Sequence, residues 1–170
     1  MAEYHATADE ARCFRLTEGS RPVGELTYPT WFTFEATLTL PDQPPFQAKP
    51  KGFWGTTIEL WQQEALLLRF KMGWNGNIIL HAAFGGEEQD FVFQLKGFFK
   101  NQYVLTDTQQ QELLVLQPDF KWKKVTYEFD IATVEAFEAL PYKDVLLLLT
   151  VHLANYYITM MSATAVLAAT

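Results

Sequence analysis

An uncharged stretch at residues 145–170 is the strongest restriction on the fold of this chain. As a helix it is long enough to cross a bilayer, because about 20 apolar residues span the hydrocarbon core. The sequence before it is instead rich in β-strand signals. The chain is therefore either a β-domain anchored in a membrane by this helix, or a β-barrel that closes around the helix.

Alternating apolar and polar residues indicate a succession of strands. Between residues 31 and 40 every second residue from Phe32 to Leu40 is apolar, which is the period of a half-buried strand. Turn signals separate such segments, for example the Asn75-Gly76 pair, which tolerates the positive φ angles of a tight hairpin. The pattern predicts about eleven strands at the spacing typical of an antiparallel sandwich or barrel. Ten of these strands have definite bounds, at residues 13–16, 23–28, 31–40, 54–61, 65–72, 77–84, 90–98, 103–106, 112–116 and 122–131.

Details within the apolar stretch favour a helix inside a barrel. Polar residues recur three or four positions apart on one side of the helix, where strand side chains can satisfy them; they are His152, Asn155, Thr159 and Ser162. Tyr156 and Tyr157 lie in the middle of the segment, whereas a spanning helix usually places aromatic rings at the two membrane interfaces. A barrel of about a dozen strands is also too wide for strand side chains alone to fill.

The expected fold is mainly β (α+β). We predict one domain over residues 1–170, an antiparallel β-barrel of about 11–12 strands enclosing a hydrophobic helix at about 142–168. A tail-anchored membrane protein with a cytoplasmic β-domain remains the alternative, because hydropathy alone favours an anchor.

Composition restricts the partners and the compartment. The formal net charge of −7 and the pI near 4.9 oppose a nucleic-acid partner, since such binding depends on clustered lysine and arginine. The single cysteine, Cys13, can form no internal disulfide, and the first residues show no secretory signal. We expect a cytoplasmic protein, located either freely or at the inner surface of the membrane.

No residue pattern points to catalysis, to a cofactor or to a metal. His5, His81 and His152 are dispersed and lack metal-ligand spacing, and no nucleophile motif accompanies them. Acidic residues after Gly85-Gly86 lack the spacing of a calcium-binding loop and are interpreted as a solvated hairpin tip. We therefore expect a protein that is not an enzyme.

Lysines and tryptophans supply the one candidate binding site. Lysines near an anionic membrane surface contribute on the order of 1 kcal/mol each, and tryptophan suits the headgroup region. Solvated lysines that prevent sheet aggregation are the competing interpretation. The candidate lipid-binding residues are Lys49, Lys51, Trp54, Lys121, Trp122, Lys123 and Lys124.

Four segments in the second half of the chain carry a resemblance to a known fold. Residues 91–97 read FVFQLKG, residues 103–107 YVLTD, residues 112–116 ELLVL, and residues 121–127 KWKKVTY. Together with the terminal apolar helix, this order resembles the tubby C-terminal-like fold, particularly the LURP-one-related and phospholipid scramblase families. The resemblance covers residues 91–170 by sequence motif. Over residues 13–84 it is limited to the spacing of the predicted strands. Residues 108–111 depart from it, because those families often place glycine in that turn.

The resemblance implies a barrel around a central helix, and it implies lipid as a ligand class. Tubby proteins are associated with phosphoinositides, and scramblases with calcium and lipid, but neither ligand set maps onto residues of this chain. The function that we expect is a soluble, non-enzymatic binding or scaffolding module that contacts phospholipid headgroups at the membrane surface, or a protein.

Overall fold

The computed structural model covers residues 1–170. Residues 11, 31–33, 53–56, 98–100 and 169–170 are not described, nor are the side chains of residues 10 and 162–168. The strands are β1 (Ala2–Glu10), β2 (Cys13–Glu18), β3 (Arg21–Thr27), β4 (Ala36–Thr39), β5 (Phe46–Lys51), β6 (Thr57–Gln62), β7 (Ala65–Met72), β8 (Ile78–Phe84), β9 (Glu87–Lys96), β10 (Gln102–Asp107), β11 (Glu112–Lys121) and β12 (Thr126–Thr133). Two helices follow, α1 (Glu135–Glu138) and α2 (Lys143–Ala168).

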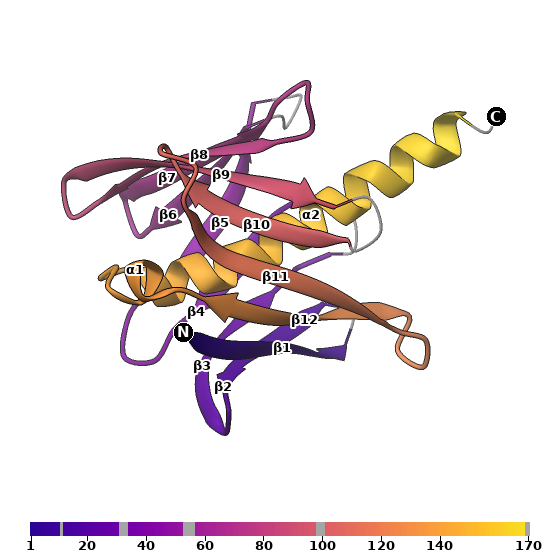
Figure 1. Ribbon diagram of the computed structural model, residues 1–170, viewed down its shortest axis with the longest axis horizontal. Coiled ribbons are helices and arrows are strands. Elements are labelled where there is room, and N and C mark those ends of the chain that lie inside the picture. Colours follow the sequence, from indigo (N-terminus) through magenta and orange to yellow (C-terminus); the bar gives the residue numbers. More distant parts are fainter. Residues whose placement is uncertain (11, 31–33, 53–56, 98–100, 169–170) are drawn as a thin grey trace.

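The twelve strands form one closed antiparallel barrel around α2 (Figure 1). Each strand pairs with its neighbours in the sequence, and β1 closes the ring by pairing with β12, from Ala2 opposite Thr133 to Ala6 opposite Phe129. Closure pairs every strand on both sides, which removes the free edges at which sheets aggregate. The predicted fold class is thus confirmed.

Alternation along the strands separates the barrel interior from its outer surface. In β8, Ile78, Leu80 and Ala82 are buried while the residues between them are exposed. Large aromatic side chains from the strands fill the interior; the fully buried ones include Phe14, Phe70, Phe91, Phe93 and Phe129. These side chains reach inward to α2, so strands and helix share one core.

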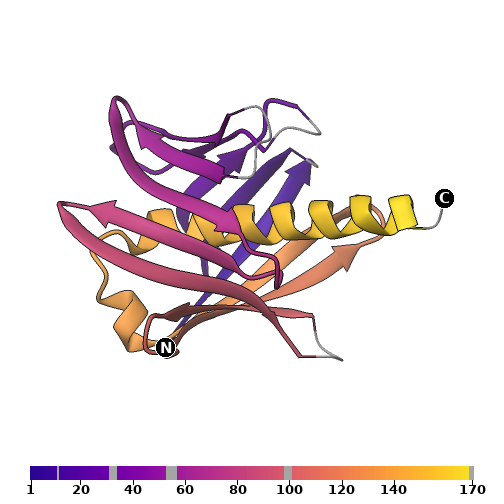
Figure 2. The same cartoon turned by 90° about the horizontal axis from the view of Figure 1, so that it is seen from above.

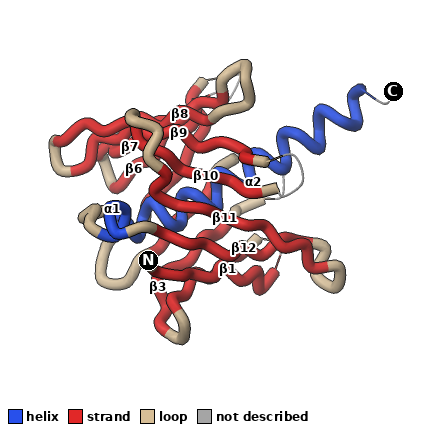
Figure 3. The backbone as a smooth tube through the Cα atoms, in the orientation of Figure 1, coloured by secondary structure: helices blue, strands red, loops and turns tan. Residues whose placement is uncertain are grey.

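Helix α2 runs along the axis of the barrel (Figure 2). Residues Leu146, Leu149 and Leu153 are fully buried, and every leucine of the first half of the helix lies in the core. By length and composition, the segment Lys143–Met161 could cross a membrane. However, 67% of its most apolar stretch of 18 residues is buried inside the protein. A spanning helix would be surrounded by lipid, whereas α2 is surrounded by the strands of the barrel (Figure 3).

The start of α2 is attached to the barrel through the short helix α1. The carboxylate of Glu138 accepts hydrogen bonds from the Tyr4 hydroxyl at 2.9 Å and from Lys143 Nζ at 2.6 Å, and it also accepts one from the Thr133 hydroxyl. Tyr4 lies on the first strand and Thr133 at the end of the last one. Glu138 therefore connects the helix to the pair of strands that closes the barrel.

The helix lies against β3 and β4, and Gly24 of β3 allows this approach. A Cβ atom at Gly24 would lie 2.6 Å from the Thr39 carbonyl oxygen, 2.7 Å from Leu40 Cδ2 and 2.9 Å from Leu148 Cδ1. These distances are too short for any side chain. A glycine at this position lets strand and helix pack in direct contact.

Two strands were not predicted, β1 and β5. In β1 the inward residues Tyr4, Ala6 and Ala8 are mostly small, so the apolar alternation is weak. β5 contains Pro50, and proline cannot donate to a ladder. Pro50 pairs with Ile58 of β6, whereas the pairing of β5 with β4 ends at Ala48, so the missing N–H breaks no ladder.

The predicted strand over residues 122–131 was wrong at its start. Residues 122–125 form the turn between β11 and β12, closed by a hydrogen bond from Lys124 N to Lys121 O at 3.1 Å. Val125 adopts a φ angle of 51° there. The strand predicted over residues 31–40 is described as a strand only over Ala36–Thr39.

Candidate functional site

The up-and-down topology gives the barrel two different ends. Because neighbouring strands run in opposite directions, the connections after β1, β3, β5, β7, β9 and β11 all lie at one end. Helix α2 follows β12, enters the barrel at the opposite end, and emerges at this one (Figures 1 and 2). We call the two ends the helix-exit end and the helix-entrance end.

Charge separates the two ends among the described residues. Three of the strands that run toward the helix-exit end finish with a lysine, namely Lys51, Lys96 and Lys121, and Lys71 is the penultimate residue of β7. The turns at the helix-entrance end and their flanking residues carry two cations, Arg21 and Lys143, and Lys143 is paired with Glu138. The acidic residues there are Glu18, Asp42, Glu64, Glu87, Glu88, Asp107, Glu112, Glu135, Glu138 and Asp144. The protein therefore presents a basic end and an acidic end, although its net charge is −7.

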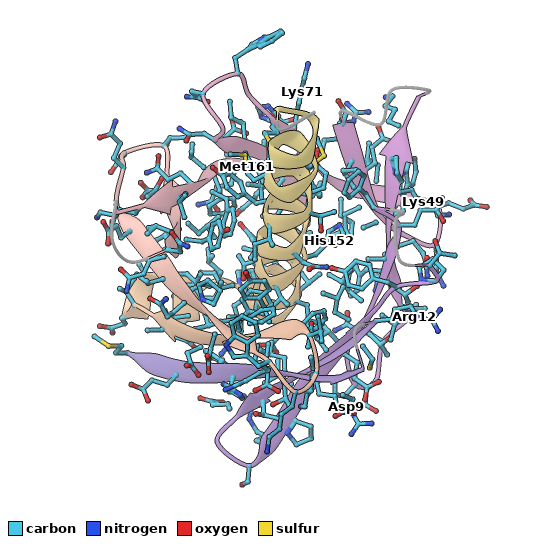
Figure 4. All side chains as sticks on the ribbon, turned by 90° about the vertical axis from the view of Figure 1, so that its right-hand side faces the viewer. Asp9, Arg12, Lys49, Lys71, His152 and Met161 are labelled. Carbon is cyan, nitrogen blue, oxygen red and sulfur yellow. The ribbon has the colours of Figure 1, made fainter. Side chains whose placement is uncertain are left out.

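Exposed apolar side chains also gather at the helix-exit end. Trp74 lies fully exposed in the turn between β7 and β8, and Trp122, 84% exposed, lies in the turn between β11 and β12 together with Val125. Met161 is half exposed on α2 where the helix emerges (Figure 4). Leu95 precedes the last residue of β9. Of the large apolar residues exposed in the described part of the chain, only Met1 and Ile79 lie elsewhere.

The structure distributes the predicted lipid-binding residues around the ring. Lys51 lies at the helix-exit end, and so do the four residues 121–124; Lys49 lies on the outer wall of β5 (Figure 4). Trp54 lies outside the described residues. Five strands separate β5 from β11 in either direction around the ring. Five of the seven predicted residues, Lys51 and residues 121–124, therefore share one end of the barrel, without forming one continuous patch.

Several of these lysines already have acidic partners. Lys51 Nζ lies 3.0 Å from Glu59 Oε1, and Lys124 Nζ lies 2.8 Å from Glu128 Oε1. Lys121 pairs with Asp119 and lies 3.6 Å from Glu128. Ion pairing leaves these lysines less available to a ligand.

Lys71 and Lys123 differ from them, because both are exposed and make no ion pair with the described residues. Arg12, in the turn between β1 and β2, is also exposed and makes no ion pair with the described residues; it donates a hydrogen bond to the Pro29 carbonyl oxygen. Lys71, Lys123 and Arg12 are the cations most available at the helix-exit end. Lys49, on the outer wall of β5, is also exposed and makes no ion pair with the described residues.

The pKa shifts of the acidic partners agree with this pairing. The Lys51 ammonium lowers the pKa of Glu59, with a further contribution from Arg69 at 2.9 Å, against the opposing effect of burial. Burial also acts to raise the pKa of Glu128, but Lys124, Lys121 and His5 together lower it below its ordinary value. Both carboxylates are therefore charged at neutral pH.

Sequence reasoning missed three residues of the helix-exit end: Lys71, Trp74 and Met161. The signal for Trp74 was present, because residues 73–76 were recognised as a tight turn and a side chain at a hairpin tip is exposed. Lys71 and Met161 carry no such signal. Their place depends on the direction of β7 and on the point where α2 leaves the barrel.

The histidines do not form a reactive site. His5 Nδ1 lies 2.6 Å from Asp130 Oδ1, and His81 Nδ1 lies 2.8 Å from Asp90 Oδ1, both on the outer surface. His152 lies on α2 and is buried in the core, where it contacts Tyr28. Within the described part of the chain, no group of three or more metal-ligating side chains comes together.

The comparisons with known proteins assign no relative to the chain. No protein-family model, no curated protein and no solved structure gave a significant match.

Proposed function

We propose that this protein is a non-enzymatic, peripheral membrane-binding module whose helix-exit end contacts an anionic lipid surface. One observation carries the proposal: lysine-terminated strands, exposed tryptophans and the emerging apolar helix all meet at the same end of the barrel. A flat bilayer can contact a ring of separate turns, so a single continuous patch is not required.

The physical properties of the residues agree with this ligand. A lysine close to an anionic leaflet contributes on the order of 1 kcal/mol, and tryptophan is favoured at the headgroup level of membranes. The acidic helix-entrance end would face away from the lipid, which reduces the repulsion expected from a net charge of −7. Anionic leaflets line the cytoplasmic side of membranes, so we propose a cytoplasmic location.

The proposed lipid preference is for negative surface charge in general. A polyphosphate headgroup is usually held by several basic side chains that converge on it. Here the available cations, Lys71, Lys123 and Arg12, lie on three different hairpins, and Lys121 and Lys124 are paired with carboxylates. Such a spread suits many monovalent headgroups rather than one pocket.

Vesicle flotation tests the proposal. The protein is mixed with vesicles of phosphatidylcholine alone, or of phosphatidylcholine with phosphatidylserine, at low and high salt. We expect flotation with the anionic vesicles, and less of it at high salt because screening weakens exposed charges. Equal flotation with both compositions, or none with either, would overturn the proposal.

Matched variants locate the contact. Lys123→Glu should lower binding to anionic vesicles several-fold, whereas Arg21→Glu makes the same charge change at the opposite end and should leave binding unchanged. Trp74→Ala with Trp122→Ala should weaken binding further. Ile79→Ala is the control, because Ile79 is an exposed apolar residue on the wall of β8.

We also propose a relation to the tubby-like families, on the motifs of residues 91–127 and the order of strands followed by one helix. A closed barrel alone does not identify that fold. Sequences intermediate between this chain and those families, aligned continuously over residues 91–170, would support the relation, and their alignment to another fold would contradict it.

A further inference from the structure

We infer that residues 162–168, the part of α2 beyond Met161, insert into the leaflet that the helix-exit end contacts and act as an anchor there. This inference rests on the proposed function and adds how deeply the protein is held. It assigns two different surroundings to one helix that carries no charge after Asp144: protein along its first two thirds, and lipid beyond.

Burial along α2 falls steadily toward its emerging end. Leu146 to Leu149 are fully buried, Tyr157 is 8% exposed, Ile158 to Met160 are partly buried, and Met161 is 50% exposed. The helical backbone continues from there to Ala168 and passes beyond the strands (Figures 1 and 2). The apolar character of the sequence therefore continues after the barrel has stopped covering the helix.

The length of the emerging part fits insertion into the headgroup region. Residues 162–168 read SATAVLA and contain no charge. At 1.5 Å per residue, seven helical residues extend over about 10 Å, which is the depth to which interfacial elements enter the boundary between headgroups and acyl chains.

The barrel keeps the rest of α2 away from lipid. The buried leucines of its first half belong to the same core cluster as the buried residues of the strands. Moving them into lipid would leave the barrel without its core, and the ties from Glu138 to Lys143, Tyr4 and Thr133 hold the start of the helix at the opposite end. Only the emerging part is free to enter a leaflet.

The neighbouring turns fit the same depth. Trp74 and Trp122 lie on two hairpins at the end where α2 emerges, separated by β9 and β10. Tryptophan prefers the headgroup level, and lysine remains in water beside it. With these residues at the surface of the leaflet, the helix that extends past the strands would reach below the surface.

The test places an environment-sensitive fluorophore on a cysteine at two positions. In a Cys13→Ser background, Thr164→Cys labels the emerging part of α2, and Thr108→Cys labels the turn between β10 and β11 at the opposite end. On addition of phosphatidylserine-containing vesicles, we expect a blue shift and quenching by acyl-chain-brominated lipid at position 164 only. If the protein floats with vesicles and position 164 stays in water, the insertion is wrong and the proposed function stands. If the protein does not float, both fail.

A charge variant provides a second, independent measurement. Val166→Asp with Leu167→Asp should lower partitioning to anionic vesicles at least tenfold, because carboxylates oppose both insertion and the anionic surface. Thr108→Asp with Gln109→Asp adds the same charge at the helix-entrance end and should change partitioning less than twofold. If the first variant instead dissociates an oligomer that sedimentation detects without vesicles, the emerging helix binds a second copy of the chain and the insertion is overturned.

Discussion

The hydroxyl group of Tyr28 lies 2.9 Å from Nδ1 of His152; His152 is buried in the core and Tyr28 is partly buried against it. Asn155, one turn further along the helix, hydrogen-bonds to the same hydroxyl. Phe70 contacts the His152 ring edge to face, and His152 Nε2 is buried with no hydrogen-bond partner in the described structure. Desolvation lowers the pKa of His152 to about 4, so this histidine is neutral in the core.

His152 makes the stability of the barrel depend on pH. An unfolded histidine has a pKa near 6.5, so between about pH 6.5 and 4 the unfolded chain binds a proton that the native protein does not. Stability therefore falls as the pH is lowered through this window. From pH 7 to pH 5 we expect His152 to account for a loss of about 2 kcal/mol. Urea denaturation at both pH values measures it.

His152→Gln should remove this part of the pH dependence, whatever it does to stability at pH 7. His81→Gln changes a histidine on the outer surface and should leave the dependence intact. An unchanged slope in His152→Gln would show that the buried imidazole does not titrate as described.

Removal of the helix distinguishes a core element from an anchor. A chain without residues 145–170 should fail to fold, because the strands would lose the leucines that fill the barrel. A chain shortened only after Met161 should retain the urea midpoint of the full chain, and its circular dichroism should change only by the helical signal of the removed residues. A folded, soluble barrel after the longer deletion would instead support the tail-anchored alternative.

A single leucine tests the same packing more gently. Leu147→Ala should lower the free energy of unfolding by about 2–5 kcal/mol, because the side chain is fully buried and leaves a cavity. Met161→Ala on the same helix should cost less than about 1 kcal/mol, since half of that side chain is exposed. Chemical denaturation of both variants gives the comparison, and equal losses would contradict the enclosed helix.

Gly24→Ala should destabilise the barrel by about 1–3 kcal/mol. The added methyl group would meet a backbone oxygen of Thr39 and a methyl group of Leu148 at less than 3.0 Å, so strand and helix must separate. Gly73→Ala is the control, because its closest contact there is the Asn75 side chain at 3.1 Å. A neutral effect at Gly24 would mean that α2 does not lie against β3 as described.

Glu138→Ala should lower stability by about 1–3 kcal/mol, because it leaves Lys143, Tyr4 and Thr133 without their shared acceptor. Burial acts to raise the pKa of Glu138, but these three donors lower it below its ordinary value. Glu135→Ala removes an exposed carboxylate from the same short helix and should have little effect. Thermal unfolding of the two variants compares them, and matching midpoints would argue against the connection.

Strong local signals predicted most of the strands. The hairpin formed by β2 and β3 follows from glycine and proline between two apolar segments, and the turn before β8 follows from Asn75-Gly76. β1 and β5 escaped prediction because what stabilises them is not local. β1 is held by β12 from the far end of the sequence, and Pro50 is tolerated only because β4 stops short of it.

The candidate site was only partly predictable for the same reason. The sequence singled out Trp122, Lys123 and Lys124 as basic and aromatic, but described them as a strand, where they form an exposed turn. It also grouped them with Lys49 and Lys51, which lie across the barrel. Which lysines face the same direction depends on strand polarity, and which are neutralised depends on partners such as Glu128 that only the fold brings close.

The sequence by itself determined most of the secondary-structure elements: alternating strands, turns at glycine and proline, and one long apolar helix. These could be predicted because periodicity and turn chemistry depend on only a few neighbouring residues. The tertiary structure decided where these parts meet. Pairing of β1 with β12 closed the wall, closure made the helix a core element over its first two thirds, and the alternation of strand direction brought Lys71, Trp74 and Trp122 to the end where α2 emerges. These outcomes depend on contacts between residues far apart in the chain, which no local pattern encodes.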